Sequence, residues 1–200
     1  MPSLKLVKHK TKKSILHSSA SRTKKIKTHK MNTTNNITEK HGTYADNTHI
    51  YSNDLMFMYI QDKRPNSVKL PLASLVHHLR ENDWSDWSTP GTPAFSAMDV
   101  LKNPNKYKEH YQRILDAELK YPIIIDKKTG YVIDGMHRLA KSYMLNKPDI
   151  RAHVFDDKLM SKFILTSKPD AKKEWTGADW EYYESLTIPE LKQLYRERFP

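Results

Sequence analysis

Hydrophobic residues in the middle of the chain change their spacing within one short stretch. Residues 123–125 are three consecutive isoleucines bounded by polar residues, which is typical of a buried strand. Residues 131–133 resume this pattern after a polar turn containing Gly130, so the two segments predict a β-hairpin. From Met136 onward, apolar residues recur every three or four positions, as on one face of a helix. The pattern therefore predicts strand, turn, strand and then a helix that begins just after Gly135.

The other apolar segments predict further helices and strands around this unit. Residues 55–60 (LMFMYI) read as an edge strand, and residues 68–71 as a short strand that leads into a helix with Leu72, Leu75, Val76 and Leu79 on one face. We expect helices at 96–101, 104–119, 158–165 and 189–199, the last opened by a capping box of Thr187 and Glu190, and a strand at 150–155. The sequence predicts a mixed α/β (α+β) fold.

Two adjacent histidines lie within the helix predicted after residue 71. Successive side chains on an α-helix diverge by about 100 degrees, so His77 and His78 would point in different directions. We interpret them as surface residues rather than as ligands of one metal ion.

The first 43 residues differ in composition from the rest of the chain. They hold eleven Lys or Arg and one acid, Glu39, which is a net charge of +10. The whole chain carries +11, so residues 44–200 carry +1. With few large apolar residues, the segment 1–43 cannot bury enough surface to fold, and we expect a disordered basic tail.

The turn between the second strand and the helix carries the candidate chemistry. Free backbone N–H groups at the start of a helix attract anions, and Arg138 in the first turn could add a bidentate fork for phosphate. His137 could add a second donor. A carboxylate beside a phosphate is repulsive unless it holds a metal ion, accepts a proton or caps the helix, so Asp134 has one of these roles. The simplest alternative is that Asp134 only caps the helix and Arg138 lies on the surface.

The segment DGMHRLAK, preceded by YPIII and a short turn, resembles the core motif of the ParB N-terminal/sulfiredoxin-like superfamily. The resemblance covers roughly residues 66 to 165. It implies a single small α/β domain, at residues 54–165, in which Gly135, Met136, His137 and Arg138 bind the phosphates of a nucleotide. A helical C-terminal extension, residues 166–200, would follow. In the superfamily this site serves DNA clamps, sulfinic-acid reductases, free-serine kinases and nucleases.

Two departures narrow the comparison. Sulfiredoxins carry a catalytic Cys directly before the His-Arg pair, whereas this sequence has Met136 there and no Cys. The chromosome-partitioning clamps continue into a helix-turn-helix domain, for which the remaining residues leave little room. The serine-kinase-like members, with an Asp-Gly-His-His-Arg motif, are the most similar of these groups.

The resemblance implies an enzyme that transfers or hydrolyses a terminal phosphoryl group. Its cofactors would be Mg²⁺, bound at Asp134, and a nucleoside di- or triphosphate such as ATP, ADP or CTP. The candidate catalytic residues are Asp134, His137 and, as general base, Glu118. Both His110 and Arg113 could clamp phosphate from the preceding helix, or Arg113 could form an ion pair with Glu109 or Asp116.

Aromatic residues occur in the loop at residues 83–93. Here Trp84 or Trp87 could anchor the loop to the core, which is the favoured interpretation, or stack on a nucleobase.

The alternative function is a non-enzymatic DNA- or RNA-associated module, or a ParB-like nuclease, that uses the basic tail. Lysine-rich segments bind polyanions by counterion release. The residues concerned are Lys10, Lys12, Lys13, Arg22, Lys24, Lys25 and Lys27, which could equally form nuclear-localisation patches. The absence of a secretory signal and of a long apolar segment favours an intracellular protein, cytoplasmic or nuclear, that is neither secreted nor membrane-bound. The oligomeric state is open.

Overall fold

A computed structural model describes residues 39–81, 84, 93–168 and 177–200, with only the backbone described at 177–179. These residues form a small mixed α+β domain, which confirms the predicted fold class. The tail lysines and arginine proposed for nucleic-acid binding, and Trp87, lie outside the described residues. In the part of the chain that the structure describes, no helix is both long and apolar enough to cross a bilayer.

A four-stranded sheet carries the predicted hairpin at one edge. Its order is β3 (Val68–Pro71), β6 (Asp149–Phe155), β4 (Ile123–Asp126) and β5 (Val132–Asp134). Strands β4 and β6 are parallel, and the other neighbours are antiparallel. The isoleucines of β4 alternate between the two faces of the sheet, with Ile123 and Ile125 in one core and Ile124 in the other. Burial on both faces explains the uninterrupted apolar run.

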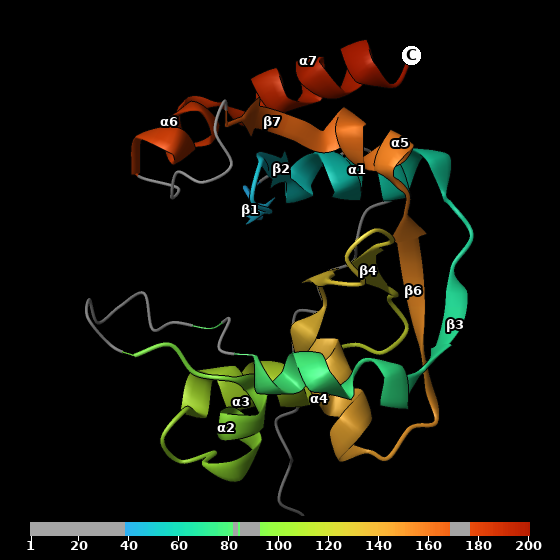
Figure 1. The fold of residues 1–200 in the computed structure, drawn as a ribbon, viewed down its shortest axis with the longest axis vertical. Coiled ribbons are helices and arrows are strands. Elements are labelled where there is room, and N and C mark those ends of the chain that lie inside the picture. The colour runs from blue at the N-terminus through green and yellow to red at the C-terminus, as the bar shows by residue number, and fades with distance from the viewer. Residues whose placement is uncertain (1–38, 82–83, 85–92, 169–176) are drawn as a thin grey trace, which may run out of the picture. The chain divides into compact units, whose positions relative to one another are not determined.

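On one face of this sheet lies the first core, which the strands share with a group of helices (Figure 1). These helices are the 3₁₀-helices η1 (Leu72–Ser74) and η2 (Val76–Arg80) and the α-helices α2 (Ala97–Lys102), α3 (Lys108–Asp116) and α4 (Met136–Met144). The predicted helix after residue 71 is thus two short 3₁₀-helices, although its apolar residues Leu72, Leu75 and Leu79 are buried as expected. In α4, Leu139 and Ala140 are completely buried against the sheet, which fixes the position of the preceding turn.

The second core lies on the opposite face. It is formed by α1 (Asn53–Lys63), α5 (Asp157–Met160), η3 (Ser161–Phe163) and α7 (Ile188–Arg198). A three-stranded antiparallel sheet, with the order β1 (Thr43–Ala45), β2 (His49–Ser52) and β7 (Ile164–Ser167), adjoins this core, and α6 (Gly177–Ser185) follows. The domain therefore includes strands at residues 43–52, which precede the boundary predicted from sequence.

The strand predicted at residues 55–60 is wrong, because this segment is the middle of α1. The side chain of Ser52 caps the helix by accepting a hydrogen bond from the backbone N–H of Leu55, at 3.2 Å. Arg64 ends it in the left-handed conformation, with φ of 47°. The predicted helix at 158–165 is also partly wrong, since β7 begins at Ile164 and pairs with β2.

The C-terminal helix α7 was predicted correctly. The capping box of Thr187 and Glu190 is present, and Leu191 and Tyr195 face the second core. The Tyr195 hydroxyl donates a hydrogen bond to Asp62 in α1, at 2.8 Å. The extension therefore packs on the domain as an integral part of it.

Candidate functional site

The turn of residues 134–138, called here the DGMHR turn, joins β5 to α4. Gly135 is the N-cap residue of α4 and has φ of 103°, in the region that favours glycine. A Cβ at this position would lie 2.5 Å from Ile123 Cγ2 and 2.8 Å from Arg138 Nη2. No side chain of the described residues caps α4. The first N–H groups of the helix are therefore left for solvent or a ligand.

The turn is closed by an ion pair between Asp134 and Arg138, whose side chains are 30% and 20% exposed. The N-cap position belongs to Gly135, so the interpretation of Asp134 as a helix cap is wrong. Its carboxylate instead accepts a hydrogen bond from Arg138 Nη2 through Oδ2. Among the described residues, the buried Nε of Arg138 has no hydrogen-bond partner. The guanidinium is thus held in place by Asp134 while retaining donors for a further acceptor.

His137 lies in the first turn of α4 and is partly buried. Burial and the neighbouring charges of His110 and Arg113 lower the pKa of His137 to about 4, so its imidazole is neutral near pH 7. Its Nε2 atom is buried and has no hydrogen-bond partner among the described residues. The ring stacks on Trp84, with 4.7 Å between centroids. His137 is therefore a neutral donor or acceptor beside the start of α4.

A ring cluster brings α3 to the DGMHR turn. The ring of His110 lies 4.8 Å from that of Trp84 and 5.8 Å from that of His137, with all three nearly parallel. Phe95 contacts His110 edge-on at 5.1 Å. Because Trp84 also packs against the first core, the structure supports its predicted role as an anchor of the loop. The stack also fixes the two histidines relative to each other.

The other predicted site residues are placed differently. The side chain of Arg113 is 59% exposed and forms an ion pair with Glu109 at 2.7 Å. This is the predicted alternative to a phosphate clamp. The side chain of Met136 packs against the first core, so only its backbone N–H is available at the turn. Glu118 is exposed and pairs with Lys120. Its described contacts do not include the DGMHR turn, so the structure gives no support to its role as general base.

A buried carboxylate that sequence reasoning missed lies at the start of α1. Asp54 is completely buried and accepts hydrogen bonds from the backbone N–H and ring Nδ1 of His41, at 3.0 and 2.8 Å, and from the Tyr183 hydroxyl, at 2.9 Å. The hydrogen bond with Asp54 raises the pKa of His41, and the charge of Asp134 adds to this effect. No local sequence signal points to this network, because Tyr183 lies 129 positions from Asp54 along the chain.

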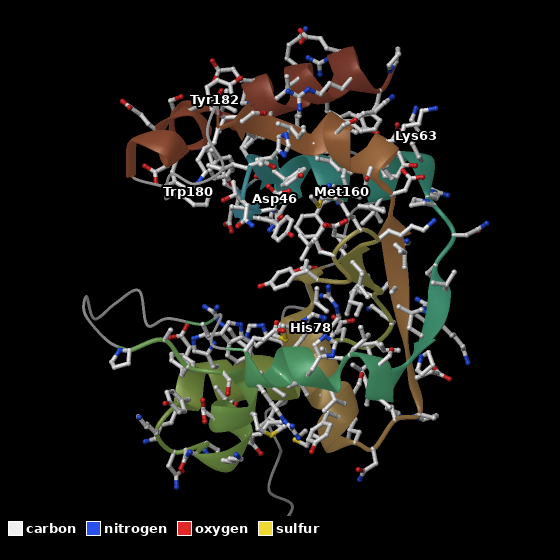
Figure 2. The ribbon with its side chains drawn as sticks, in the orientation of Figure 1. Asp46, Lys63, His78, Met160, Trp180 and Tyr182 are labelled. Atoms are coloured by element: carbon white, nitrogen blue, oxygen red, sulfur yellow. The ribbon has the colours of Figure 1, made fainter. Side chains whose placement is uncertain are left out.

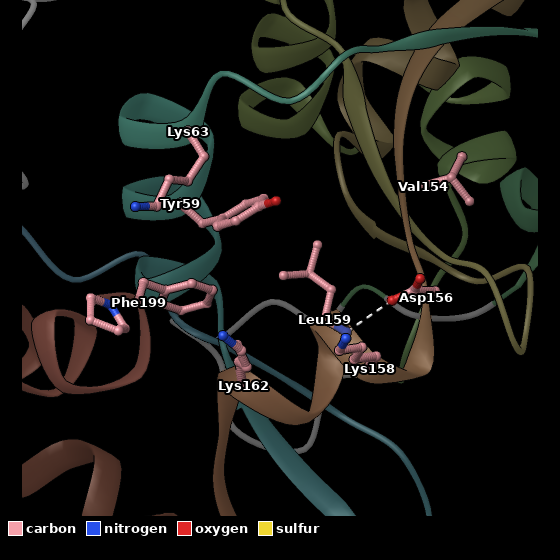
Figure 3. Close-up of a pocket in the computed structure, with 9 residues that line it drawn as sticks. Tyr59, Lys63, Val154, Asp156, Lys158, Leu159, Lys162 and Phe199 are labelled. Atoms are coloured by element: carbon pink, nitrogen blue, oxygen red, sulfur yellow. Dashed lines mark hydrogen bonds between the residues drawn. The ribbon is translucent and has the colours of Figure 1, made fainter.

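A separate pocket of about 580 Å³ contains none of the predicted site residues (Figure 3). It lies on the side of the second core, and its lining combines the rings of Tyr59 and Phe199 with Lys63, Lys158 and Lys162. Two of these cations are already engaged, since Lys162 Nζ donates to the Arg198 carbonyl at 3.1 Å and Lys63 forms an ion pair with Asp62 at 3.2 Å. None of the residues that line this pocket belongs to the DGMHR turn.

Comparisons of the chain with protein-family models, with curated proteins and with solved structures give no match. The resemblance to the ParB/sulfiredoxin-like superfamily therefore stays a prediction that depends on the DGMHR motif.

Proposed function

We propose that the DGMHR turn binds the phosphate groups of a nucleoside di- or triphosphate. The observation that carries this proposal is the uncapped start of α4. Gly135, with its positive φ, occupies the N-cap position, and no side chain of the described residues caps the helix, so the first N–H groups lie free close to Arg138. Close packing of Gly135 on the buried Ile123 holds this turn against β4.

Two buried nitrogens support the same proposal. His137 Nε2 and Arg138 Nε are buried and have no hydrogen-bond partner among the described residues. Leaving a buried polar group unpaired costs about 1–3 kcal/mol of stability. A phosphate oxygen at the turn could accept from Arg138 and from a neutral His137. The ion pair with Asp134 would hold the guanidinium ready, which lowers the entropic cost of binding.

Asp134 is the carboxylate that could hold Mg²⁺ at this site. Mg²⁺ is commonly bound by one or two carboxylates together with substrate phosphates and water. Arg138 occupies Oδ2 of Asp134, which leaves Oδ1 for a metal ion, so the residue fits a role as single protein ligand. When bound, Mg²⁺ would neutralise charge on the phosphates; His137 and Arg138 would bind and orient the phosphoryl oxygens.

With these groups the favoured activity is phosphoryl transfer or nucleotide hydrolysis. Asp134→Asn should retain nucleotide binding and lose turnover, because the amide keeps an acceptor for Arg138 but is a poor ligand for Mg²⁺. The measurement is phosphate release or transfer from radiolabelled ATP and CTP. Turnover at the wild-type rate in this variant would contradict the catalytic part of the proposal and leave the binding part standing.

The first experiment on the binding part is a thermal-shift panel of ATP, ADP, CTP and GTP with Mg²⁺. A ligand that binds only the native state stabilises it by about 2.7 kcal/mol at a hundredfold excess over Kd. We expect a base-selective shift in the wild type that is absent in Arg138→Ala. No shift with any of the four nucleotides would contradict nucleotide binding.

A second candidate function is a DNA- or RNA-associated module, including a ParB-like nuclease. It is favoured by the charge distribution, since residues 1–43 hold +10 of the total +11. In that case the tail supplies the affinity and nucleic-acid binding survives Arg138→Ala. Cleavage of plasmid DNA that needs Asp134 would identify the nuclease variant of this function.

A further inference from the structure

Three potential metal ligands gather at the end of η2, outside the DGMHR turn. The ligand atoms of His77, His78 and Glu81 all lie within 4.8 Å of one another. His78, labelled in Figure 2, is buried, whereas His77 is exposed and Glu81 is partly exposed. The expectation that the two histidines diverge is wrong, since their ring centroids lie 3.9 Å apart, and the interpretation of both as surface residues is wrong for His78, which is buried.

The hydrogen bonds of His78 fix where its ring hydrogen lies. Its Nε2 is 3.0 Å from the backbone carbonyl oxygen of Gly130. A carbonyl oxygen can only accept, so Nε2 must carry a hydrogen. In a neutral imidazole the other nitrogen, Nδ1, then presents a lone pair, and it lies 2.9 Å from Glu81 Oε2. Nδ1 of His78 and Oε2 of Glu81 would then both be acceptors. Either a hydrogen on Nδ1 or a metal ion must lie between them.

We propose that His77, His78 and Glu81 bind a divalent transition-metal ion of the Zn²⁺ class. Histidines that ligate metals usually donate their second ring N–H to a carboxylate or a backbone carbonyl, which fixes the tautomer and the ring orientation. The contact of His78 with Gly130 has this form. A metal ion between Nδ1 and the Glu81 carboxylate also removes the conflict between the two acceptors.

The ligand set favours Zn²⁺, Co²⁺ or Ni²⁺ over Mg²⁺. Imidazole nitrogen suits the first group, whereas Mg²⁺ prefers oxygen ligands. Tetrahedral coordination at about 2.1 Å places ligand atoms about 3.4 Å apart. The exposed side chain of His77 can rotate to close the wider separations, and water would complete the coordination. This site is therefore distinct from the Mg²⁺ site considered at Asp134.

The bound ion would fasten η2 to the turn of the β4–β5 hairpin. Gly130 belongs to that turn, and the ring of the next residue, Tyr131, contacts His78 edge-on at 5.7 Å. The turn leads directly into β5, which ends at Asp134. The metal site is independent of nucleotide binding, and either could exist without the other.

The test is titration of the full-length, metal-free protein with Co²⁺ and Zn²⁺. Visible absorption reports Co²⁺ in a four- or five-coordinate site, and isothermal titration gives the stoichiometry and Kd for Zn²⁺. The variants are His77→Ala and Glu81→Gln, chosen because both side chains are more exposed than His78 and their loss should leave the fold intact. Circular dichroism and thermal unfolding without metal check that point.

The matched control removes histidines from the tail, where His9, His17 and His29 could also bind metal. We expect one tight ion per chain in the wild type and in the triple tail variant. Each η2 variant should raise Kd roughly tenfold or more. The proposal is overturned if the wild type binds no tight ion, if the tail variant loses the ion, or if both folded η2 variants bind as the wild type does.

Discussion

Replacing Gly135 by alanine perturbs the DGMHR turn at its tightest point. The added Cβ would meet two atoms of Ile123, at 2.5 and 2.9 Å, and Nη2 of Arg138, at 2.8 Å. The arginine side chain can move away. Ile123 cannot, because it is completely buried in the central strand β4.

The expected cost has two parts. Holding an alanine in a left-handed conformation costs about 1–2 kcal/mol, and φ at Gly135 is 103°. Overpacking a buried site adds about 1–3 kcal/mol. The free energy of unfolding should therefore fall by about 2–5 kcal/mol.

The matched control is Gly130→Ala in the hairpin turn. Gly130 also has a positive φ, of 73°, but a Cβ there would meet nothing within 4 Å. This variant should show only the backbone cost, about 1–2 kcal/mol. Urea denaturation followed by circular dichroism measures both variants. With a slope of about 2 kcal/mol per molar urea, Gly135→Ala should lower the midpoint by about 1–2.5 M.

The difference between the two variants isolates the steric contacts of Gly135. If Gly135→Ala costs no more than Gly130→Ala, then β4 does not press on the turn. The argument that packing on β4 holds the turn at the uncapped start of α4 in place would then fail.

Three other predictions test separate parts of the structure. Because burial lowers the pKa of His137 to about 4, the unfolded chain binds a proton below pH 6.5 that the native chain does not. As the pH falls from 6.5 to 4, the wild type should therefore lose up to about 1.4 kcal/mol of unfolding free energy per pH unit more than His137→Gln does. If the unfolding free energies of both proteins change equally with pH, the lowered pKa of His137 is wrong. Asp54→Asn should lower the free energy of unfolding by about 2–3 kcal/mol, because the amide nitrogen cannot accept the hydrogen bonds that the carboxylate accepts from His41 and Tyr183. Thermal unfolding measures this change. A loss below about 0.5 kcal/mol, which is usual for substitutions at the surface, would refute the network's role. Deleting residues 1–38, which hold ten Lys or Arg, should abolish salt-dependent DNA binding without lowering the thermal midpoint of the domain; binding that persists unchanged would place the nucleic-acid surface elsewhere.

Local sequence patterns predicted the elements that carry the DGMHR turn. The isoleucine run, the glycine at the hairpin and the helical spacing after Met136 each act over a few residues, and β4, β5 and α4 followed them. The capping box at Thr187 succeeded for the same reason. In these segments the signals from neighbouring residues all favour the same element, so the sequence pattern was sufficient to predict it.

The failures have two physical causes. The segment 55–60 mixes Met, Leu and aromatic residues without a clear period, so the cap at Ser52 and packing against α7 decided its helical form. The other cause is distance along the chain: the stack of Trp84 with His110 and His137 depends on tertiary packing that no local pattern encodes. For η2, the contact between the rings of His77 and His78 depends on how the two side chains rotate, which helical spacing alone does not predict.

The central claim is that the DGMHR turn binds nucleotide phosphates, and isothermal titration with Mg²⁺-nucleotide tests it most directly. The titration compares the wild type with Arg138→Ala and with the matched control Arg196→Ala, which removes an exposed arginine of α7 that donates to Gln193. We predict binding by the wild type and by the control, and at least a roughly tenfold higher Kd for Arg138→Ala, since a charge-assisted contact contributes about 1.5–3 kcal/mol. Equal affinity of all three proteins, or no binding by the wild type, would contradict the claim.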